Sequence, residues 1–263
     1  MKVATNNLSI HVEQQGSGDC ALVFLHYWGG SSRTWRHVTK QLARDFHCLA
    51  IDHRGWGQSD APADGYGLAD LAADAEGVIQ ALGLRRYLLV GHSMGGKVAQ
   101  LMASRRPEGL MGLVLVAPSP PQPMAMPQPA RDIMAVAYNS RQAVEAALDH
   151  MLTARTLSGE DREFAIADSL AGAPAAKAAW PRATSLEDIS ATVSEIAVPV
   201  LVIAGELDRV DTPDLLRAEL LSRVPQAVMA ILPGTGHLSM LEAPDEVSQL
   251  IHQFCGQIFI PQA

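Results

Sequence analysis

Cysteine is scarce in this chain of 263 residues. The three cysteines, Cys20, Cys48 and Cys255, are odd in number and widely separated, and no two form a Cys-x-x-Cys pair. This pattern indicates neither a disulfide framework nor a zinc site, so we expect small, buried apolar side chains at these positions. The histidines show no His-Glu-x-x-His motif and no other metal-ligand spacing. The sequence therefore predicts no metal site and no cofactor.

Basic residues and long apolar runs are also few. Lys and Arg total 20 against 28 Asp and Glu, and they are scattered singly or in pairs. Nucleic-acid binding needs a basic stripe, so we expect no nucleic-acid partner.

The longest apolar stretches, at 109–118 and 197–205, are far shorter than the roughly 20 residues that span a bilayer. Residues 1–16 lack an apolar segment, so we expect a soluble, cytoplasmic protein with no membrane contact.

Apolar runs of strand length recur along the chain, with helical patterns between them. The runs are mostly continuous, as in strands covered on both faces of a parallel sheet; they lie at 21–25, 48–51, 87–90, 111–117, 200–204 and 228–232. The helical patterns lie at 32–44, 68–82, 94–106, 213–222 and 244–257. The sequence predicts an α/β protein with a doubly wound, mostly parallel sheet. Alternation over residues 8–14 predicts an antiparallel edge hairpin before it.

The alternation of strands and helices is interrupted once. A proline-rich segment follows Ala117, and the next sixty or so residues are alanine-rich, with helical spacing and no strand pattern. We therefore expect a core formed by residues 1–118 and 191–263, and a helical insertion over the sheet at 119–190. Its larger apolar side chains either line a substrate pocket or form the insertion's own small core; they are Met124, Met126, Met134, Tyr138, Met151 and Trp180.

The segment from Val90 to Gly96, Val-Gly-His-Ser-Met-Gly-Gly, follows a predicted strand and begins a predicted helix. A G-x-S-x-G sequence in this context is typical of a nucleophile elbow, which exposes the serine hydroxyl on a strained turn. The alternative is an ordinary helix-capping role for Ser93. A phosphate-binding loop is disfavoured because Val98 stands where the Mg²⁺-binding Ser or Thr is required.

A serine nucleophile needs a base and an acid that orients the base. His237 follows the predicted strand at 228–232, and Asp208 follows the one at 200–204. Both therefore belong to the same sheet edge as Ser93, in the chain order Ser, Asp, His. Asp211 and Glu206 compete with Asp208 as helix-capping or solvated carboxylates. Three further histidines adjoin motifs, and we expect them to satisfy backbone groups; they are His26, His53 and His92.

Together these motifs resemble the α/β-hydrolase superfamily, over essentially the whole chain. The segment 26–32, His-Tyr-Trp-Gly-Gly-Ser-Ser, resembles its oxyanion loop, and 52–59, Asp-His-Arg-Gly-Trp-Gly-Gln-Ser, resembles its D-x-R-G-x-G-x-S turn. The resemblance implies a catalytic triad of Ser93 as nucleophile, His237 as general base and acid, and Asp208 as orienting acid. It implies oxyanion-hole donors at the N–H groups of Trp28 and Met94. The insertion then corresponds to a helical cap. Among the large apolar side chains that can line a substrate pocket, we expect substrate contacts at Trp28, Tyr138 and Trp180.

The elbow serine also narrows the reaction. Haloalkane dehalogenases and epoxide hydrolases share the flanking motifs but use Asp at this position, so their chemistry is disfavoured. The leading hypothesis is a carboxylesterase-type hydrolase that cleaves a small to medium, largely apolar ester or lactone through an acyl-enzyme. C–C hydrolysis, perhydrolysis, amide cleavage, elimination and ligand binding without turnover stay open. The physiological substrate and the oligomeric state, including a homodimer, also stay open. It is likewise open whether residues 258–261 form a docking tail.

Overall fold

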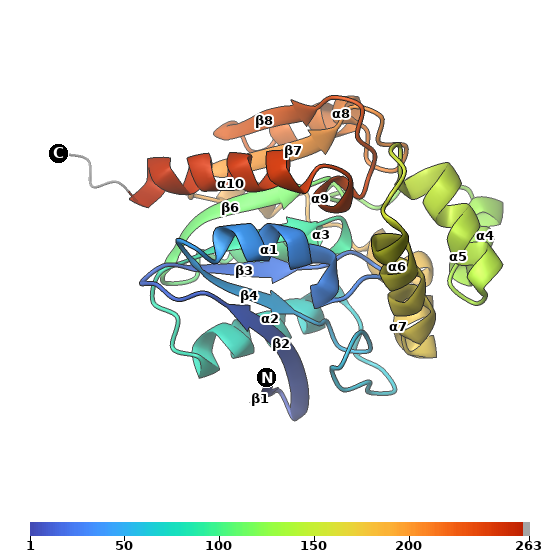
Figure 1. Cartoon of the computed structure of the whole chain (residues 1–263), viewed down its shortest axis with the longest axis horizontal. Helices are drawn as coiled ribbons and strands as arrows, with labels where there is room; N and C mark the ends of the chain where they lie inside the picture. Colours follow the sequence, from blue (N-terminus) through green and yellow to red (C-terminus); the bar gives the residue numbers. More distant parts are fainter. Residues whose placement is uncertain (260–263) are drawn as a thin grey trace.

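The computed structural model describes residues 1–259 and contains one eight-stranded sheet (Figure 1). Its strands run in the order β1-β2-β4-β3-β5-β6-β7-β8. They are β1 (Lys2–Thr5), β2 (Leu8–Gln15), β3 (Ala21–Leu25), β4 (His47–Ile51), β5 (Tyr87–His92), β6 (Leu110–Val116), β7 (Val200–Gly205) and β8 (Ala227–Leu232). The sheet is parallel from β4 to β8, and β2 pairs antiparallel with both β1 and β4. The predicted fold class and the antiparallel hairpin at the sheet edge are confirmed.

Helices cover both faces of the sheet (Figure 1). On one face α1 (Arg36–Leu42) packs against α10 (Pro244–Phe259), and on the other α2 (Leu68–Ala81) packs against α3 (Met94–Ser104). The short helices α8 (Pro213–Leu216) and α9 (Ser239–Glu242) follow β7 and β8. The helix predicted at 32–44 is divided, because the Ser31 side chain caps a separate 3-10 turn, η1 (Ser32–Trp35). Residues 260–263 lie outside the described part, so the proposed docking tail is not assessed beyond Phe259.

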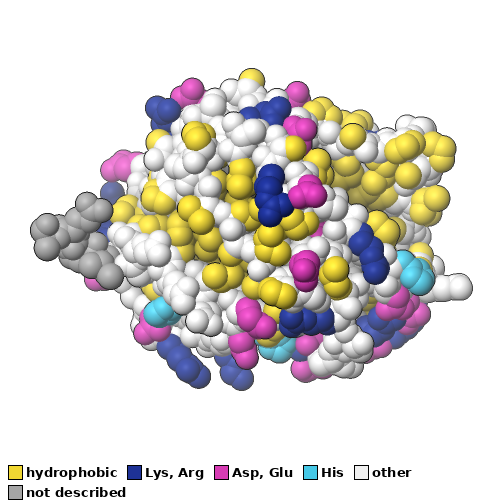
Figure 2. All heavy atoms as spheres, turned by 90° about the horizontal axis from the view of Figure 1, so that it is seen from above, with side chains coloured by type: hydrophobic (Ala, Val, Ile, Leu, Met, Phe, Trp, Pro, Cys, Tyr) yellow, Lys and Arg dark blue, Asp and Glu magenta, His cyan; other side chains and the backbone are white. Residues whose placement is uncertain are grey.

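Two expectations about burial are wrong. Strand β8 is not covered on both faces, since Val228 is 67% exposed and Ile231 38% exposed. It is the last strand of the sheet and pairs only with β7, so its apolar side chains contribute to the surface seen from above in Figure 2. Cys20 is half-buried, because it precedes β3 in the loop before the sheet, whereas Cys48 and Cys255 are buried. All three cysteines are free thiols.

Between β6 and β7 the chain forms helices and turns, with no strand in this fully described segment. They are α4 (Gln128–Val136), α5 (Arg141–Ala147), η2 (Leu148–Leu152), α6 (Gly159–Ala171), α7 (Pro174–Arg182) and η3 (Thr184–Leu186), followed by η4 (Val193–Glu195). Figure 1 shows them at the end of the sheet toward which the parallel strands point. This region, residues 119–190, is called the insertion below. Some of its apolar side chains are exposed, and Figure 2 shows apolar side chains gathered at this end; they include Ile133, Val136, Met151 and Leu186.

Candidate active site

Ser93 lies at the sharp turn between β5 and α3, with φ of 51° and ψ of −116°. A positive φ is costly for a residue with a side chain and persists only where the surrounding structure imposes it. Two glycines let the turn form. A Cβ on Gly91 would lie 2.5 Å from the Gly95 carbonyl oxygen, and a Cβ on Gly95 would lie 2.5 Å from that of Leu25. Side chains at Gly91 and Gly95 would therefore collide with the neighbouring backbone, which is why the G-x-S-x-G turn needs glycine at both positions.

His237 and Asp208 form a buried pair at the same edge of the sheet. The Asp208 Oδ2 atom lies 2.8 Å from Nδ1 of His237. The other carboxylate oxygen, Oδ1, accepts the N–H groups of Val210 at 2.7 Å and Asp211 at 3.1 Å, which fixes the carboxylate plane. Because Nδ1–H donates to Asp208, Nε2 of the neutral imidazole is left as the proton acceptor.

The pKa of His237 is raised above its ordinary value of 6.5. Burial alone lowers the pKa, but the charge of Asp208 and its hydrogen bond to the ring outweigh burial. Glu242 adds a smaller contribution in the same direction, as does Asp211 when it is ionised. A base with a raised pKa accepts a proton more readily, which is the property a serine nucleophile requires from its partner.

The two competing carboxylates have other environments. Glu206 accepts the Gly234 N–H at 2.8 Å through Oε2. Asp211 is only 2% exposed, and its Oδ2 is buried without a hydrogen-bond partner, so it is neither a solvated carboxylate nor a helix cap. Burial raises the pKa of Asp211 to about 8, against the opposing charge of His237. At neutral pH Asp211 is therefore protonated, and the ring contacts Asp208.

The loop after β3 presents the peptide unit between Tyr27 and Trp28. The Tyr27 carbonyl oxygen accepts Nδ1–H of His26 at 2.7 Å and the Gly30 N–H at 3.0 Å. His26 holds this tautomer because its Nε2 accepts the His53 N–H at 3.0 Å, and burial lowers the pKa of His26. A peptide unit is planar, with N–H opposite to C=O, so the direction of the Trp28 N–H depends on both bonds to the Tyr27 oxygen, one from His26 and one from Gly30 further along the loop.

The N–H groups of Trp28 and Met94 are free to bind a ligand oxygen. Within residues 1–259 neither of them donates a hydrogen bond to a protein group. Met94 is the first residue of α3, where backbone N–H groups have no partner within the helix and the helix dipole favours negative charge. The His237 ring is hydrogen-bonded to Asp208, and within the described residues no hydrogen bond joins it to the Ser93 hydroxyl.

His92 supports the loop that carries His237. Its Nε2–H donates to the His237 carbonyl oxygen at 2.9 Å, and the two rings lie 4.9 Å apart. Burial lowers the pKa of His92 well below its ordinary value, so the ring stays neutral. His26 and His92 thus bind backbone groups, as expected from the sequence. The same expectation is wrong for His53, whose ring Nε2 is buried without a hydrogen-bond partner.

The site is nearly closed to solvent, since Ser93 is 7% exposed and His237 is 2% exposed. The candidate substrate contacts Trp28, Tyr138 and Trp180 are buried as well. The rings of Trp28 and Tyr138 lie 4.1 Å apart, and the Tyr138 hydroxyl donates to the Trp28 carbonyl oxygen at 3.0 Å.

The described residues contain no group of three or more His, Cys, Asp or Glu side chains placed to hold a metal ion. They also contain no helix that is long and apolar enough to cross a membrane.

A model of the α/β hydrolase family matches residues 22–250. The chain belongs to the α/β-hydrolase family.

Relatives of this hydrolase act on different substrates. It is 29% identical over 255 residues to the pimeloyl-[acyl-carrier protein] methyl ester esterase of Yersinia enterocolitica, covering 92% of this chain and 95% of that one. It is also 29% identical, over 267 residues, to a 2-hydroxy-6-oxononadienedioate/2-hydroxy-6-oxononatrienedioate hydrolase of Paraburkholderia phymatum, covering 95% and 92%. The solved esterase of Exiguobacterium antarcticum shares the fold, with a TM-score of 0.90, 21% identity and coverage of 97% and 98%.

The turn that begins at Asp52 forms hydrogen bonds to segments next to the candidate site of this hydrolase. The Asp52 carboxylate accepts the Ser32 N–H at 2.5 Å and Nδ1–H of His11 at 2.9 Å. Arg54 makes two hydrogen bonds of 2.6 Å to the Asp74 carboxylate. Asp52 therefore holds the loop after β3, and Arg54 ties the turn to α2.

Sequence reasoning missed the residues through which the insertion contacts the site of this hydrolase. Glu242 accepts three N–H groups through Oε2, from Ala154 and Arg155 of the insertion and from Gly236 beside His237. Asp168 accepts the Ser31 hydroxyl of the loop after β3, and the Ser169 hydroxyl donates to the Gly29 carbonyl oxygen of the same loop. No periodicity or motif marks these side chains, because their partners lie far away in the sequence.

Proposed function

We propose that this α/β hydrolase is a serine hydrolase of the carboxylesterase type, which cleaves a small to medium, largely apolar ester or lactone. The observation that carries the proposal is the buried pair of Asp208 and His237, 2.8 Å apart, at the sheet edge where Ser93 occupies its strained turn. This combination supplies an oriented base for a serine hydroxyl.

In this mechanism His237 Nε2 takes the proton of the Ser93 hydroxyl as Oγ attacks the substrate carbonyl carbon. The oxyanion that forms is stabilised by the N–H groups of Trp28 and Met94. Protonated His237 then gives its proton to the leaving alcohol, which leaves an acyl group on Ser93. Water, activated by the same imidazole, attacks the acyl-enzyme and releases the acid. Asp208 stabilises the imidazolium throughout.

The insertion, residues 119–190, serves in this proposal as a cap over the core formed by 1–118 and 191–263. Its position at the carboxyl ends of the strands supports this role, since substrates of such sheets bind there. Trp28, Tyr138 and Trp180 contact the apolar part of the substrate. The methyl ester esterase among the relatives supports an ester as the bond cleaved.

The test is hydrolysis of p-nitrophenyl esters of increasing acyl length by the wild type and by Ser93→Ala. We expect turnover with an optimum at one chain length, abolished in the variant. Ser248→Ala is the matched control, because the Ser248 hydroxyl donates to a backbone carbonyl within α10. Turnover that survives in Ser93→Ala would refute the nucleophile. A wild type that binds these esters without turnover would instead support ligand binding.

A further inference from the structure

The loop that carries Trp28 is not held by the core alone. Gly29 and Gly30 follow Trp28, and Gly29 has φ of 101°. Two successive glycines give the backbone wide conformational freedom, so a loop of this composition does not keep one geometry by itself. The core fixes the Tyr27 carbonyl through His26, but the next two carbonyls need other partners.

Those partners come from the insertion. The Tyr138 hydroxyl donates to the Trp28 carbonyl oxygen at 3.0 Å, and the Ser169 hydroxyl donates to the Gly29 carbonyl oxygen at 2.9 Å. All of these groups are buried. The peptide planes on both sides of Gly29 are thus fixed by side chains more than a hundred residues further along the chain. The second plane carries the Gly30 N–H, which donates to the Tyr27 oxygen at 3.0 Å, and this oxygen lies in the same peptide unit as the Trp28 N–H.

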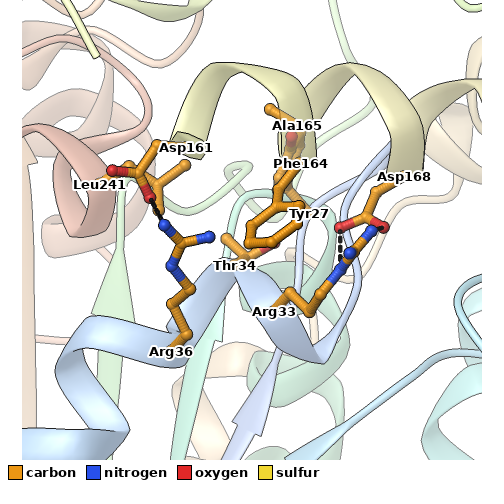
Figure 3. Close-up of a pocket in the computed structure, with 9 residues that line it drawn as sticks. All are labelled: Tyr27, Arg33, Thr34, Arg36, Asp161, Phe164, Ala165, Asp168 and Leu241. Atoms are coloured by element: carbon orange, nitrogen blue, oxygen red, sulfur yellow. Dashed lines mark hydrogen bonds and ion pairs between the residues drawn. The ribbon is translucent and has the colours of Figure 1, made fainter. Parts of the chain in front are cut away.

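The end of the loop is hydrogen-bonded to α6, the helix that also carries Ser169. The Ser31 hydroxyl donates to the Asp168 carboxylate at 2.7 Å, and Arg33 pairs with that carboxylate (Figure 3). The indole Nε1–H of Trp28 donates to the Lys177 carbonyl oxygen of α7 at 3.1 Å. Every residue from Trp28 to Ser31 except Gly30 is therefore bonded to the insertion.

Charged contacts next to the loop dock α6 on the core. The Phe164 ring lies between two guanidinium groups, 4.4 Å from that of Arg33 and 4.5 Å from that of Arg36 (Figure 3). Arg36 also pairs with Asp161 at 3.0 Å. These contacts bring the Asp168 and Ser169 side chains to the loop when the insertion is closed.

We propose that the insertion completes the oxyanion hole: Tyr138 and Ser169 are positioning residues that set the loop so that the Trp28 N–H faces the oxyanion formed at Ser93. The inference rests on the proposed function and deepens it. A cap that opens to admit substrate breaks these hydrogen bonds, and one that closes restores them. Closure over the substrate and assembly of the oxyanion hole are then one event.

The kinetic test removes one hydroxyl at a time. Tyr138→Phe keeps the ring that stacks on Trp28, and Ser169→Ala is as small a change in α6. We expect each to lower kcat by about 10- to 100-fold, because a misplaced oxyanion donor acts on the transition state. KM should change by less than about threefold. The inhibition constant of an alkylboronic acid, whose adduct with Ser93 places an oxygen in the hole, should rise in proportion.

Matched controls exist for both variants. Tyr66→Phe removes a hydroxyl that donates to the Pro62 carbonyl oxygen, and Ser248→Ala removes one that donates to that of Pro244. Both should keep the wild-type kcat and boronate affinity. Wild-type kcat in Tyr138→Phe and Ser169→Ala, or a rise in KM alone, would overturn the inference while leaving the proposed function intact.

A second readout does not depend on turnover. Hydrogen exchange of a peptide covering residues 26–35 should be faster in Tyr138→Phe and Ser169→Ala than in the wild type and the two controls. Unchanged exchange of this peptide would overturn the inference. Absence of Ser93-dependent hydrolysis in the wild type would count against the proposed function instead, so the two failures are distinguishable.

Discussion

At the scale of single residues, the Asp208 carboxylate determines the basicity of His237. Its charge and hydrogen bond raise the pKa of His237 against the effect of burial. The base must be neutral to accept the Ser93 proton. We therefore expect kcat/KM to rise with pH through one ionisation above the ordinary 6.5 of histidine.

Asp208→Asn removes both contributions that raise this pKa. The rising limb of the pH profile should move to lower pH, and kcat should fall by about 10⁴-fold, the loss seen in a serine protease with this substitution. Steady-state kinetics from pH 5 to 9 on a p-nitrophenyl ester provides the measurement. A wild-type profile that is flat over this range would be incompatible with His237 as base.

Asp211 gives a separate prediction about stability. Burial raises its pKa in the folded protein to about 8, whereas an unfolded Asp titrates near 3.8. A raised pKa contributes stability at low pH that is lost as the pH rises toward the folded pKa. In Asp211→Asn the amide is uncharged at every pH, like the protonated acid, so the variant does not lose this stability as the pH rises. The melting temperature of the variant relative to the wild type should therefore increase from pH 5 to 8; a constant difference would contradict the buried neutral acid.

At the scale of elements, the nucleophile elbow depends on the absence of side chains between β3 and α3. A Cβ on Gly95 meets the carbonyl oxygens of Leu25 and His26 at 2.5 and 2.6 Å. Gly95→Ala should therefore cost about 1–3 kcal/mol through overpacking and lower the melting temperature by several degrees. Gly256→Ala in α10 is the control, because nothing lies within 4 Å of its added Cβ. It should raise the melting temperature, since alanine is favoured over glycine in a helix. Equal effects of both substitutions would argue against the close approach at the elbow.

The strands were the most predictable elements. The run Ala21–Leu25 coincides with β3, and all five residues are buried, because a strand between two others must be apolar on both faces. Strand β8 shows where this reasoning fails: an apolar run gives no sign of whether the strand is central or at the edge. Helix ends shifted for a similar reason, since the capping of η1 by Ser31 depends on a local backbone geometry that periodicity does not encode.

At the scale of the whole molecule, the closed site implies motion. With Ser93 7% exposed and His237 2% exposed, a substrate reaches them only if the insertion moves. Amide exchange in α6 and α7 should therefore be faster than in β5 and β6. Hydrogen exchange detected by mass spectrometry provides the comparison. If the insertion were as protected as the sheet, another entry route would be required.

The candidate site was only partly predictable from the sequence. Ser93, Asp208 and His237 follow from motifs at the ends of β5, β7 and β8, which a parallel sheet brings to one edge. The bonds of Tyr138 and Ser169 to the loop after β3 join residues 110 and 140 positions apart. Such bonds depend on how α4 to α7 pack on the core, and an alanine-rich amphipathic pattern specifies only that they are helices.

The role of Ser93 as nucleophile is tested most directly by reaction with a fluorophosphonate. The mass of the protein after reaction is measured, and the modified residue is located by peptide mapping. We expect one added phosphonyl group, located on Ser93, with displacement of fluoride. Labelling should be absent in Ser93→Ala and strongly slowed in His237→Ala, because the hydroxyl then has no base. A label on another residue, or equal labelling of Ser93→Ala, would show that Ser93 is not the nucleophile.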